Sequence, residues 1–207
     1  MESPSVVFGV STQGATVAEA LIADLAQARG LLAAARRAGS ELAWAHSAAD
    51  LSELGFRERP GYRKMTGAIA AGAPDNVIPL PPGEDSPDLW AAAFRGQWGH
   101  KTPQPDQWPL DLPAGTVTLC LREDGGIAGV CRVDPASGLI DAPGVPPAHR
   151  GDLAGYEALL RSAAALADAP VVAVESWVEG PERVAVCERL GLTTAEYTAG
   201  WEFVLRH

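Results

Sequence analysis

The chain has 207 residues, of which 47% are hydrophobic, a proportion that supports a buried core in one large or two small domains. Its 26 acidic and 16 basic side chains give a formal net charge of −10. This balance argues against a general nucleic-acid or anionic-membrane binder, because both partners select a basic face.

The N-terminal part contains strand-like and helix-like patterns in turn. Residues 5–10 are typical of a buried strand, and residues 16–38 carry apolar side chains at helical spacing. We predict a strand over 41–46 and a short helix over 48–54. The Pro60-Gly61 pair then predicts a turn between two short strands.

A linker-like region follows. Residues 67–88 are rich in Gly, Pro, Asp and Ser, and a short strand at 76–80 interrupts them. A helix is predicted over 86–98, because this segment begins with a Ser-Pro pair that suits a helix start. A second helical piece is expected near 103–109.

The strongest local pattern is a β-hairpin. Two β-type runs, at 116–122 and 127–133, flank an Asp-Gly turn. A further glycine-containing turn leads to a strand at 139–145.

The C-terminal part alternates helices and strands. We predict a helix over 152–167, a buried strand over 170–177, a short helix over 181–189 and two short strands within 192–206. A hairpin that feeds a strand–helix–strand unit favours an α/β (α+β) fold, in which helices flank a mixed central sheet.

The three cysteines indicate the compartment. Cys120, Cys131 and Cys187 match neither a disulfide framework nor a metal motif. The N-terminus has no basic segment followed by a long apolar one, and no apolar run approaches the roughly 20 residues that span a bilayer. We expect a cytoplasmic protein without a metal site and without nucleic-acid or membrane partners.

Residues 145–155 form the most informative stretch, because a strand ends there and a helix begins. Unsatisfied backbone N–H groups and the positive end of the helix dipole make such a junction an anion site. Gly151 and Gly155 would let a pyrophosphate approach the backbone, and Arg150 could donate charged hydrogen bonds. The alternative is an ordinary helix start with no ligand.

This stretch resembles the signature of the GNAT acyltransferase superfamily. That signature is Val-x-Pro, then Arg or Gln, two residues, Gly, one residue, and Gly or Ala. Val145, Pro147, Arg150 and Gly155 match it in register, whereas Leu153 stands at the central glycine.

Two further segments carry the resemblance. Residues 187–192, Cys-Glu-Arg-Leu-Gly-Leu, are similar to the family's Tyr-Glu-Lys-Leu-Gly-Phe at the end of a later helix. Residues 93–108 look like the substrate-side helices of the tandem, mycothiol-synthase-like branch.

The resemblance implies an acyl-CoA-dependent N-acyltransferase, most often with acetyl-CoA as cosubstrate and a small amine as acceptor. Strands 139–145 and 170–176 would hold the pantetheine arm of coenzyme A, and the loop 150–155 would hold its pyrophosphate. The residues expected to bind the cofactor are Val145, Arg150, Gly151, Asp152, Leu153, Ala154 and Gly155.

Three residues are candidates for catalysis under the same resemblance. Asp141 and Glu175 would act as bases, and Cys187 takes the place of the family's tyrosine acid. Each also has a structural alternative. Asp141 could accept hydrogen bonds at a strand end, Glu175 could be a surface residue, and Cys187 could be a small buried hydrophobe. A coenzyme A-binding or regulatory module without turnover is the competing functional hypothesis.

The N-terminal residues are similar to the second half of the same unit. Residues 13–18 resemble 150–155, and Leu54-Gly55-Phe56 resembles Leu190-Gly191-Leu192. We therefore predict a partial, degenerate repeat over 1–70, a linker with a short strand over 71–85, and a complete domain over 76–207. A further possibility is that the partial copy supplies a contact surface for a homo-oligomer.

Overall fold

The structure, a computed structural model, describes residues 4–10, 14–70, 72, 74–81, 83–94, 113–177 and 179–205. The elements of the N-terminal part are β1 (Val7–Val10), β2 (Thr16–Leu21), α1 (Leu25–Ala38), β3 (Leu42–Ser47), η1 (Ser52–Leu54) and β4 (Arg57–Gly67). The C-terminal part contains β5 (Val77–Pro79), α2 (Pro87–Ala93), β6 (Val117–Glu123), β7 (Gly126–Asp134), β8 (Leu139–Gly144), η3 (Pro147–His149), α3 (Leu153–Leu166), β9 (Val172–Trp177), α4 (Pro181–Arg189) and β10 (Thr193–Val204).

The strands of the described residues form one ten-stranded sheet in the order β1-β2-β3-β10-β4-β9-β8-β7-β6-β5. The pairs β2–β3 and β8–β9 are parallel, and the other neighbours are antiparallel. The α/β fold with a mixed central sheet and flanking helices is therefore confirmed.

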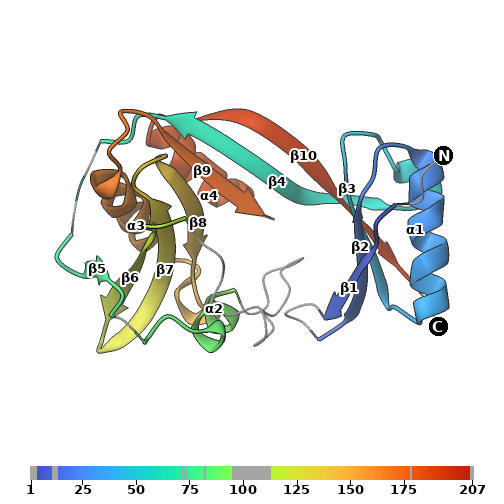
Figure 1. Cartoon of the computed structure of the whole chain (residues 1–207), viewed down its shortest axis with the longest axis horizontal. Helices are drawn as coiled ribbons and strands as arrows, with labels where there is room; N and C mark the ends of the chain where they lie inside the picture. Colours follow the sequence, from blue (N-terminus) through green and yellow to red (C-terminus); the bar gives the residue numbers. More distant parts are fainter. Residues whose placement is uncertain are drawn as a thin grey trace.

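The two parts of the chain exchange strands at the centre of this sheet. Strand β4 belongs to the N-terminal part but lies between β9 and β10. Strand β10 belongs to the C-terminal part but lies between β4 and β3. Figure 1 shows β4 and β10 as the long strands that connect the two ends of the molecule. Neither part keeps all of its own hydrogen-bonding partners, so each depends on the other to complete its sheet.

The element order β1-β2-α1-β3-η1-β4 corresponds to β7-β8-α3-β9-α4-β10. Helices α1 and α3 both have 14 residues. The exchange is also symmetrical in register, because Thr193 pairs with Thr66 at one end of β10 and Glu202 pairs with Arg57 at the other. A pseudo-two-fold relation between the two parts follows from these pairings.

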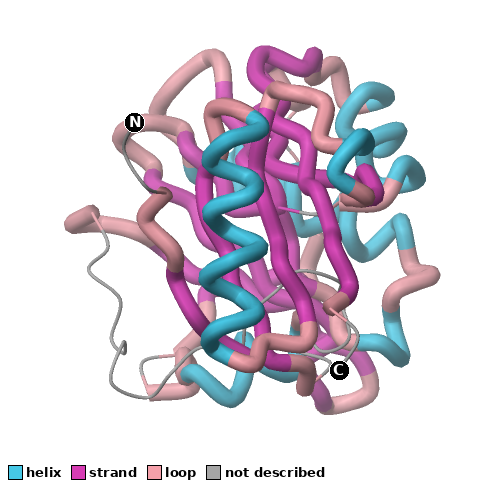
Figure 2. Tube along the Cα trace, turned by 90° about the vertical axis from the view of Figure 1, so that its right-hand side faces the viewer, coloured by secondary structure: helices cyan, strands magenta, loops and turns pink. Residues whose placement is uncertain are grey.

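Helices cover both faces of the sheet. Helix α1 lies along the outer face of the N-terminal strands (Figure 2), where Leu31, Leu32 and Ala35 are buried against β2, β3 and β10. Helices α3 and α4 pack on one face of the C-terminal strands. On β6 and β7 the side chains alternate, so that Cys120 and Val130 instead contact Trp90 and Ala93 of α2.

The structure corrects the prediction of a single helix over 16–38. Residues 16–21 form β2, and the helix begins only after Asp24, whose side chain accepts a hydrogen bond from the Gln27 backbone at 2.9 Å. Parallel pairing with β3 outweighs the helix propensity of this alanine-rich segment. The proposed match of 13–18 to 150–155 is therefore wrong for the residues that are described, because 16–18 belong to a strand.

The turn predicted at Pro60-Gly61 is also wrong. Residues 57–67 form one continuous strand, and one of the register shifts between β4 and β10 spans this dipeptide, between Tyr62 opposite Thr198 and Arg59 opposite Gly200. The C-terminal segment likewise forms one strand, Thr193–Val204, in place of two. A bulge absorbs the proline within the ladder, which local sequence patterns do not distinguish from a turn.

Most other elements agree with the predicted ones. The hairpin of β6 and β7 turns at Asp124 and Gly125, both with positive φ, as an Asp-Gly turn requires. Helix α2 has the expected Ser86 cap, with its side chain accepting from Leu89 N at 3.3 Å. The helical piece expected near 103–109 lies outside the described residues. Among the described helices, none combines the length and apolar character needed to cross a bilayer.

Gly61 offers a test of the strand exchange. A side chain at this position would overlap the Thr198 carbonyl oxygen and the Gly200 amide nitrogen of β10. We expect Gly61→Ala to lower the free energy of unfolding by about 2 kcal/mol or more, measured by urea denaturation. Gly126→Ala is the matched control, because the nearest atom to its added carbon would be the Glu123 carbonyl oxygen at 3.6 Å. Equal stability of the two variants would contradict the close crossing of β4 and β10.

Candidate active site

The parallel strands β8 and β9 separate at their carboxyl ends. Their pairing runs from Leu139 opposite Ala173 to Asp141 opposite Glu175 and then stops. Beyond that point Gly144 of β8 pairs only with β7, and Trp177 of β9 pairs with β4. Beyond this point the backbone N–H and C=O groups on the facing edges of β8 and β9 no longer form a ladder with each other.

A bulge in β8 lies where the strands diverge. Arg132 of β7 pairs with Asp141, and Val130 pairs with Gly144, so Ala142 and Pro143 together oppose a single residue. Pro143 carries no N–H group and cannot donate to a neighbouring strand. The sequence thus ends the β8–β9 ladder at this point through a bulged proline.

The corresponding strands of the N-terminal part do not separate. Strands β2 and β3 stay paired from Val17 opposite Leu42 to Leu21 opposite His46. The Ile22 backbone then donates to the His46 carbonyl at 2.9 Å and extends the ladder by one further bond. Only the C-terminal of the two parallel pairs therefore offers a gap in the described sheet.

A cavity of about 280 Å³ lies at this gap. Its walls combine aromatic rings and carboxylates from α2, β7, β8, β9 and the segment after β9. The lining residues are Trp90, Phe94, Arg132, Asp141, Ala142, Glu175, Ser176, Trp177 and Glu179. The structure thus brings Asp141 and Glu175, both predicted from the sequence, into one cavity.

Asp85 fixes one wall of the cavity. Its carboxylate accepts from Trp90 Nε1 at 2.6 Å and from the Thr118 hydroxyl at 2.8 Å. The Arg132 guanidinium lies 3.4 Å from the same carboxylate and 3.9 Å from the centroid of the Trp90 ring. A buried cation held between a carboxylate and an indole face gives this wall a fixed shape.

The N-terminal part contacts two residues of the cavity wall, Glu175 and Trp177. Lys64 of β4 lies 3.0 Å from Glu175, and the Tyr62 hydroxyl donates to the same carboxylate. Burial and this contact with Glu175 raise the pKa of Tyr62 to about 12, so its hydroxyl stays a donor. The Trp177 ring lies 4.9 Å from the ring centroids of both Tyr62 and His46. The C-terminal part therefore lines the cavity, and side chains of the N-terminal part hold Glu175 and Trp177 from behind.

Two carboxyl groups of the cavity hold their protons more tightly than usual. Burial raises the pKa of Asp141, although the Arg132 charge opposes the change. Burial also raises the pKa of Glu179 to about 7, with partial opposition from Arg183 at 3.2 Å. The Glu179 carboxyl group, with a pKa near neutral pH, is thus suited to proton transfer.

The loop 145–155 partly satisfies its own amide groups. The Asp152 amide donates to the His149 carbonyl at 2.9 Å, and the Leu153 amide donates to the Gly151 carbonyl at 3.1 Å. The Ala154 amide is capped by the Asp152 side chain at 3.1 Å. Val145 is buried, and Gly155 is buried beneath the Asp152 carboxylate. An anion at this helix start would share the site with that carboxylate.

Two guanidinium groups stand near this loop. Burial and the positive charge of Arg183 both lower the pKa of Arg150, which places the two cations close together. Arg150 Nε also donates to the Val145 carbonyl at 3.4 Å. Their mutual repulsion would be relieved by a bound anion.

Cys187 lies apart from the cavity walls. It is 3% exposed and packs in the main hydrophobic core, within hydrogen-bonding reach of the Tyr156 hydroxyl. Burial, together with the negative charge of Glu179, raises its pKa to about 11. This environment matches that of a small buried hydrophobe with a protonated thiol.

Several residues of the cavity were not foreseen from the sequence. Glu179 lies two positions after the last residue of β9. Tyr62 and Lys64, which contact Glu175, were predicted to lie in a short strand after a turn and were not connected with the site. The one available signal was an acidic residue just before the Gly-Pro start of α4, a position that commonly faces a site at the carboxyl ends of parallel strands.

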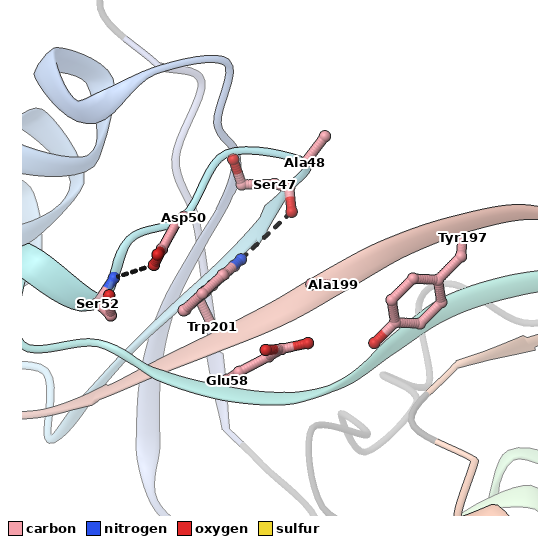
Figure 3. Close-up of a pocket in the computed structure, with 8 residues that line it drawn as sticks. All are labelled: Ser47, Ala48, Asp50, Ser52, Glu58, Tyr197, Ala199 and Trp201. Atoms are coloured by element: carbon pink, nitrogen blue, oxygen red, sulfur yellow. Dashed lines mark hydrogen bonds between the residues drawn. The ribbon is translucent and has the colours of Figure 1, made fainter.

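A second, more open depression of about 610 Å³ lies in the N-terminal part. Figure 3 shows Ser47 to Ser52 on one side, and Glu58, Trp201 and Tyr197 from β4 and β10 on the other. Two of its polar groups are already engaged, because Asp50 accepts from the Ser52 backbone at 2.8 Å and the Ser47 carbonyl accepts from the Trp201 indole at 3.2 Å. It lies beside the parallel pair that remains closed, so we favour the smaller cavity as the active site.

The described residues contain no cluster of His, Cys, Asp and Glu that could hold a metal ion. All three cysteines are buried and free.

Comparison with known proteins identifies the fold. No family model and no curated protein matches the sequence. Among solved structures, a GCN5-related N-acetyltransferase from Sphaerobacter thermophilus is similar over 91% of this chain and 74% of its own, with a TM-score of 0.55 and 15% identity. Another, from Kribbella flavida, matches over 98% and 87%, with a TM-score of 0.50 and 16% identity.

A third, from Anabaena variabilis, has a TM-score of 0.59 and 9% identity, and the match covers 97% of this chain but 58% of that protein. The chain therefore has the fold of GCN5-related N-acetyltransferases.

The buried Glu179 carboxyl predicts a pH-dependent stability. Its pKa of about 7 in the folded state exceeds the roughly 4.3 of an unfolded glutamate, so the proton favours folding. This contribution is complete below about pH 4 and is lost as the pH rises through about 7. Between these limits the parent chain should lose about 1–3 kcal/mol of unfolding free energy relative to Glu179→Gln.

Urea denaturation across this pH range measures the difference. Glu182→Gln, which changes an exposed carboxylate three residues away, should keep the parent's pH dependence, displaced to lower pH because Glu182 raises the pKa of Glu179. A difference between the parent and Glu179→Gln that does not change with pH would contradict the burial of this carboxyl group.

Proposed function

We propose that this protein is an acyl-CoA-dependent N-acyltransferase that transfers an acetyl group to a small amine. The observation that carries the proposal is the gap between β8 and β9, which opens onto a cavity lined by aromatic and acidic side chains. The fold shared with GCN5-related N-acetyltransferases supports the assignment.

The facing edges of β8 and β9 are suited to an amide-bearing chain. The pairing of β8 with β9 stops at Asp141 and Glu175, so the peptide groups of residues 142–144 and 176 can bind the amide groups of a pantetheine arm inserted between the strands. The thioester would then reach the cavity, where Trp90, Phe94 and Trp177 exclude water.

The start of α3 would take the pyrophosphate. Arg150 and Arg183 supply positive charge, and the helix dipole adds to it. Asp152 opposes binding, because its carboxylate occupies the Ala154 amide. We infer that the phosphate displaces this carboxylate, so that Gly151 and Leu153 to Gly155 come to face the phosphate.

The reaction needs a proton acceptor for the attacking amine. Asp141 and Glu175 face the cavity and are the proposed bases. Glu175 is held in place by Lys64 and Tyr62, whereas Asp141 lies at the bulge where the strands part. The nitrogen attacks the thioester carbonyl, a base removes the ammonium proton, and the carbon–sulfur bond breaks to release a thiolate.

The acceptor is proposed to be a small cationic amine. Three carboxyl groups and three aromatic rings line the cavity, and its one guanidinium is already held by Asp85. Carboxylates and indole faces both attract an ammonium group. The cavity volume of about 280 Å³ limits the bound part of the acceptor to a small group.

We propose further that the N-terminal part is a degenerate copy of the second half of the catalytic unit. The repeated order of elements supports this origin, and the closed β2–β3 pair argues that it holds no second cofactor. Its role is to complete the sheet and to hold Glu175 in place through Tyr62 and Lys64. Free, buried cysteines support the expectation of a reducing, cytoplasmic compartment.

A coenzyme A-binding module without turnover is the second candidate. Two observations favour it, namely the burial of Cys187 outside the cavity and the occupation of the helix start by Asp152. Thermal denaturation with acetyl-CoA tests binding, because a ligand of the folded state raises the midpoint. Thiol release with a panel of amines then separates the two candidates, since the module would bind and release no thiol.

Arg150→Glu should weaken the binding of acetyl-CoA. The change places a negative charge beside the pyrophosphate, and loss of one charged hydrogen bond costs about 1.5–3 kcal/mol, or roughly 10- to 150-fold in affinity. Isothermal calorimetry measures it, with one site per chain expected. Arg37→Glu, an equal change of charge on the exposed end of α1, is the control. Unchanged affinity in Arg150→Glu would refute the placement of the pyrophosphate.

Asp152→Asn should act in the opposite direction. An asparagine can still cap the Ala154 amide but carries no charge to repel phosphate. We expect acetyl-CoA to bind a few-fold more tightly, by roughly 0.5–1 kcal/mol, with little change in thermal stability. Weaker binding would show that the carboxylate supports the site instead of competing for it.

A further inference from the structure

Glu179 is placed differently from the two proposed bases, Asp141 and Glu175, because it lies after β9 and is buried. It lies in the segment between β9 and α4, lines the cavity, and is 7% exposed. The Arg183 guanidinium, 3.2 Å away, in turn lies 5.2 Å from the centroid of the Tyr156 ring. The side chain thus stands between the cavity and the core beneath α3 and α4.

Glu179 is also close to the position from which Cys187 was expected to act. The negative charge of Glu179 contributes to the raised pKa of both Cys187 and Tyr156, which requires proximity within this buried region. Of these three groups, only Glu179 also reaches the cavity wall.

We propose that Glu179 is the catalytic acid that protonates the departing coenzyme A thiolate. The inference rests on the proposed function, because it assigns one proton of that reaction. It follows from the location of a buried carboxyl group at the gap where β8 and β9 separate, between the cavity and the side chains of α3 and α4.

The proton balance is complete without a further reactant. The amine nitrogen forms a bond to the thioester carbonyl carbon, and the carbon–sulfur bond breaks with its electron pair on sulfur. The Glu179 carboxyl group gives its proton to that sulfur, and Asp141 or Glu175 takes the proton released from nitrogen. Solvent then returns a proton to Glu179 and removes one from the base, so that an amide and a thiol are the products.

Burial supports this role, because it raises the pKa of Glu179 to about 7 and keeps much of the group protonated at neutral pH. Charged groups that face Glu179 also change its pKa. Arg183 lowers it and Glu182 raises it, both from α4. Other titratable and charged groups close to it are Tyr156 of α3, Cys187 of α4, Asp141 of β8, Glu175 of β9, Arg132 of β7 and, beside Arg183, Arg150.

Cys187 is a weaker candidate for the same step. Its thiol lies in the core, does not line the cavity, and has a pKa raised to about 11 by burial. An acid with so high a pKa has little tendency to protonate a thiolate. We therefore expect Cys187→Ala to lower kcat by less than about ten-fold.

The test compares the full-length parent chain with Glu179→Gln and Glu182→Gln. Thiol release from acetyl-CoA is measured with the best amine found, from about pH 5 to pH 9, together with the calorimetric affinity for acetyl-CoA. In the parent, kcat should fall as the pH rises through about 7, because the active form of Glu179 is protonated. Glu182→Gln should keep this fall, displaced to lower pH because Glu182 raises the pKa of Glu179. In Glu179→Gln, kcat should be lower on the order of 100-fold below pH 7 and should not show this fall, while the affinity is unchanged.

A thioester of an acidic aryl thiol provides a second readout. Its thiolate leaves without a proton, so Glu179→Gln and the parent should then react at similar rates, which a merely structural defect would not produce. If the parent turns over and Glu179→Gln keeps both the rate and the pH-dependent fall, the assignment of Glu179 is overturned and the proposed function stands. If the parent binds acetyl-CoA and releases no thiol with any amine, the proposed function and this inference both fail.

Discussion

The pairing of β4 with β10 is the interaction on which the rest of the structure depends. Each strand lies among the strands of the other part of the chain, so one ladder joins two series of elements into a single sheet. This pairing also brings residues of the N-terminal part to the cavity's edge. Because β4 is the neighbour of β9, Tyr62 and Lys64 of the N-terminal part reach Glu175 at the cavity of the C-terminal part.

The two parallel pairs of strands differ at their carboxyl ends, where one pair stays closed and the other separates. Both consist of two strands joined by a helix of 14 residues. Strands β2 and β3 pair to their ends, whereas β8 carries Pro143 in a bulge and leaves β9 after Asp141. Opening the gap removes a few hydrogen bonds between β8 and β9. The buried contacts of α3 and α4 with the sheet offset this loss of stability.

The sequence predicted those features that depend on local patterns. The hairpin at Asp124-Gly125, the Ser86 cap and the mixed sheet all follow from turn chemistry, capping and periodicity. It did not predict β2, because an alanine-rich strand resembles a helix until its parallel neighbour is known. It also missed the strand exchange, and with it the approach of Tyr62 to Glu175, since pairing between residues more than 100 positions apart leaves no local signal.

The central claim is that one of the two parallel pairs binds acyl-CoA and the other does not. Amide hydrogen exchange of the full chain, with and without saturating acetyl-CoA, tests this most directly. We predict slower exchange in residues 142–155 and 172–177 on binding, and no change in residues 16–25 and 42–47. Protection in the N-terminal segments, or protection in neither pair despite measurable binding, would contradict it.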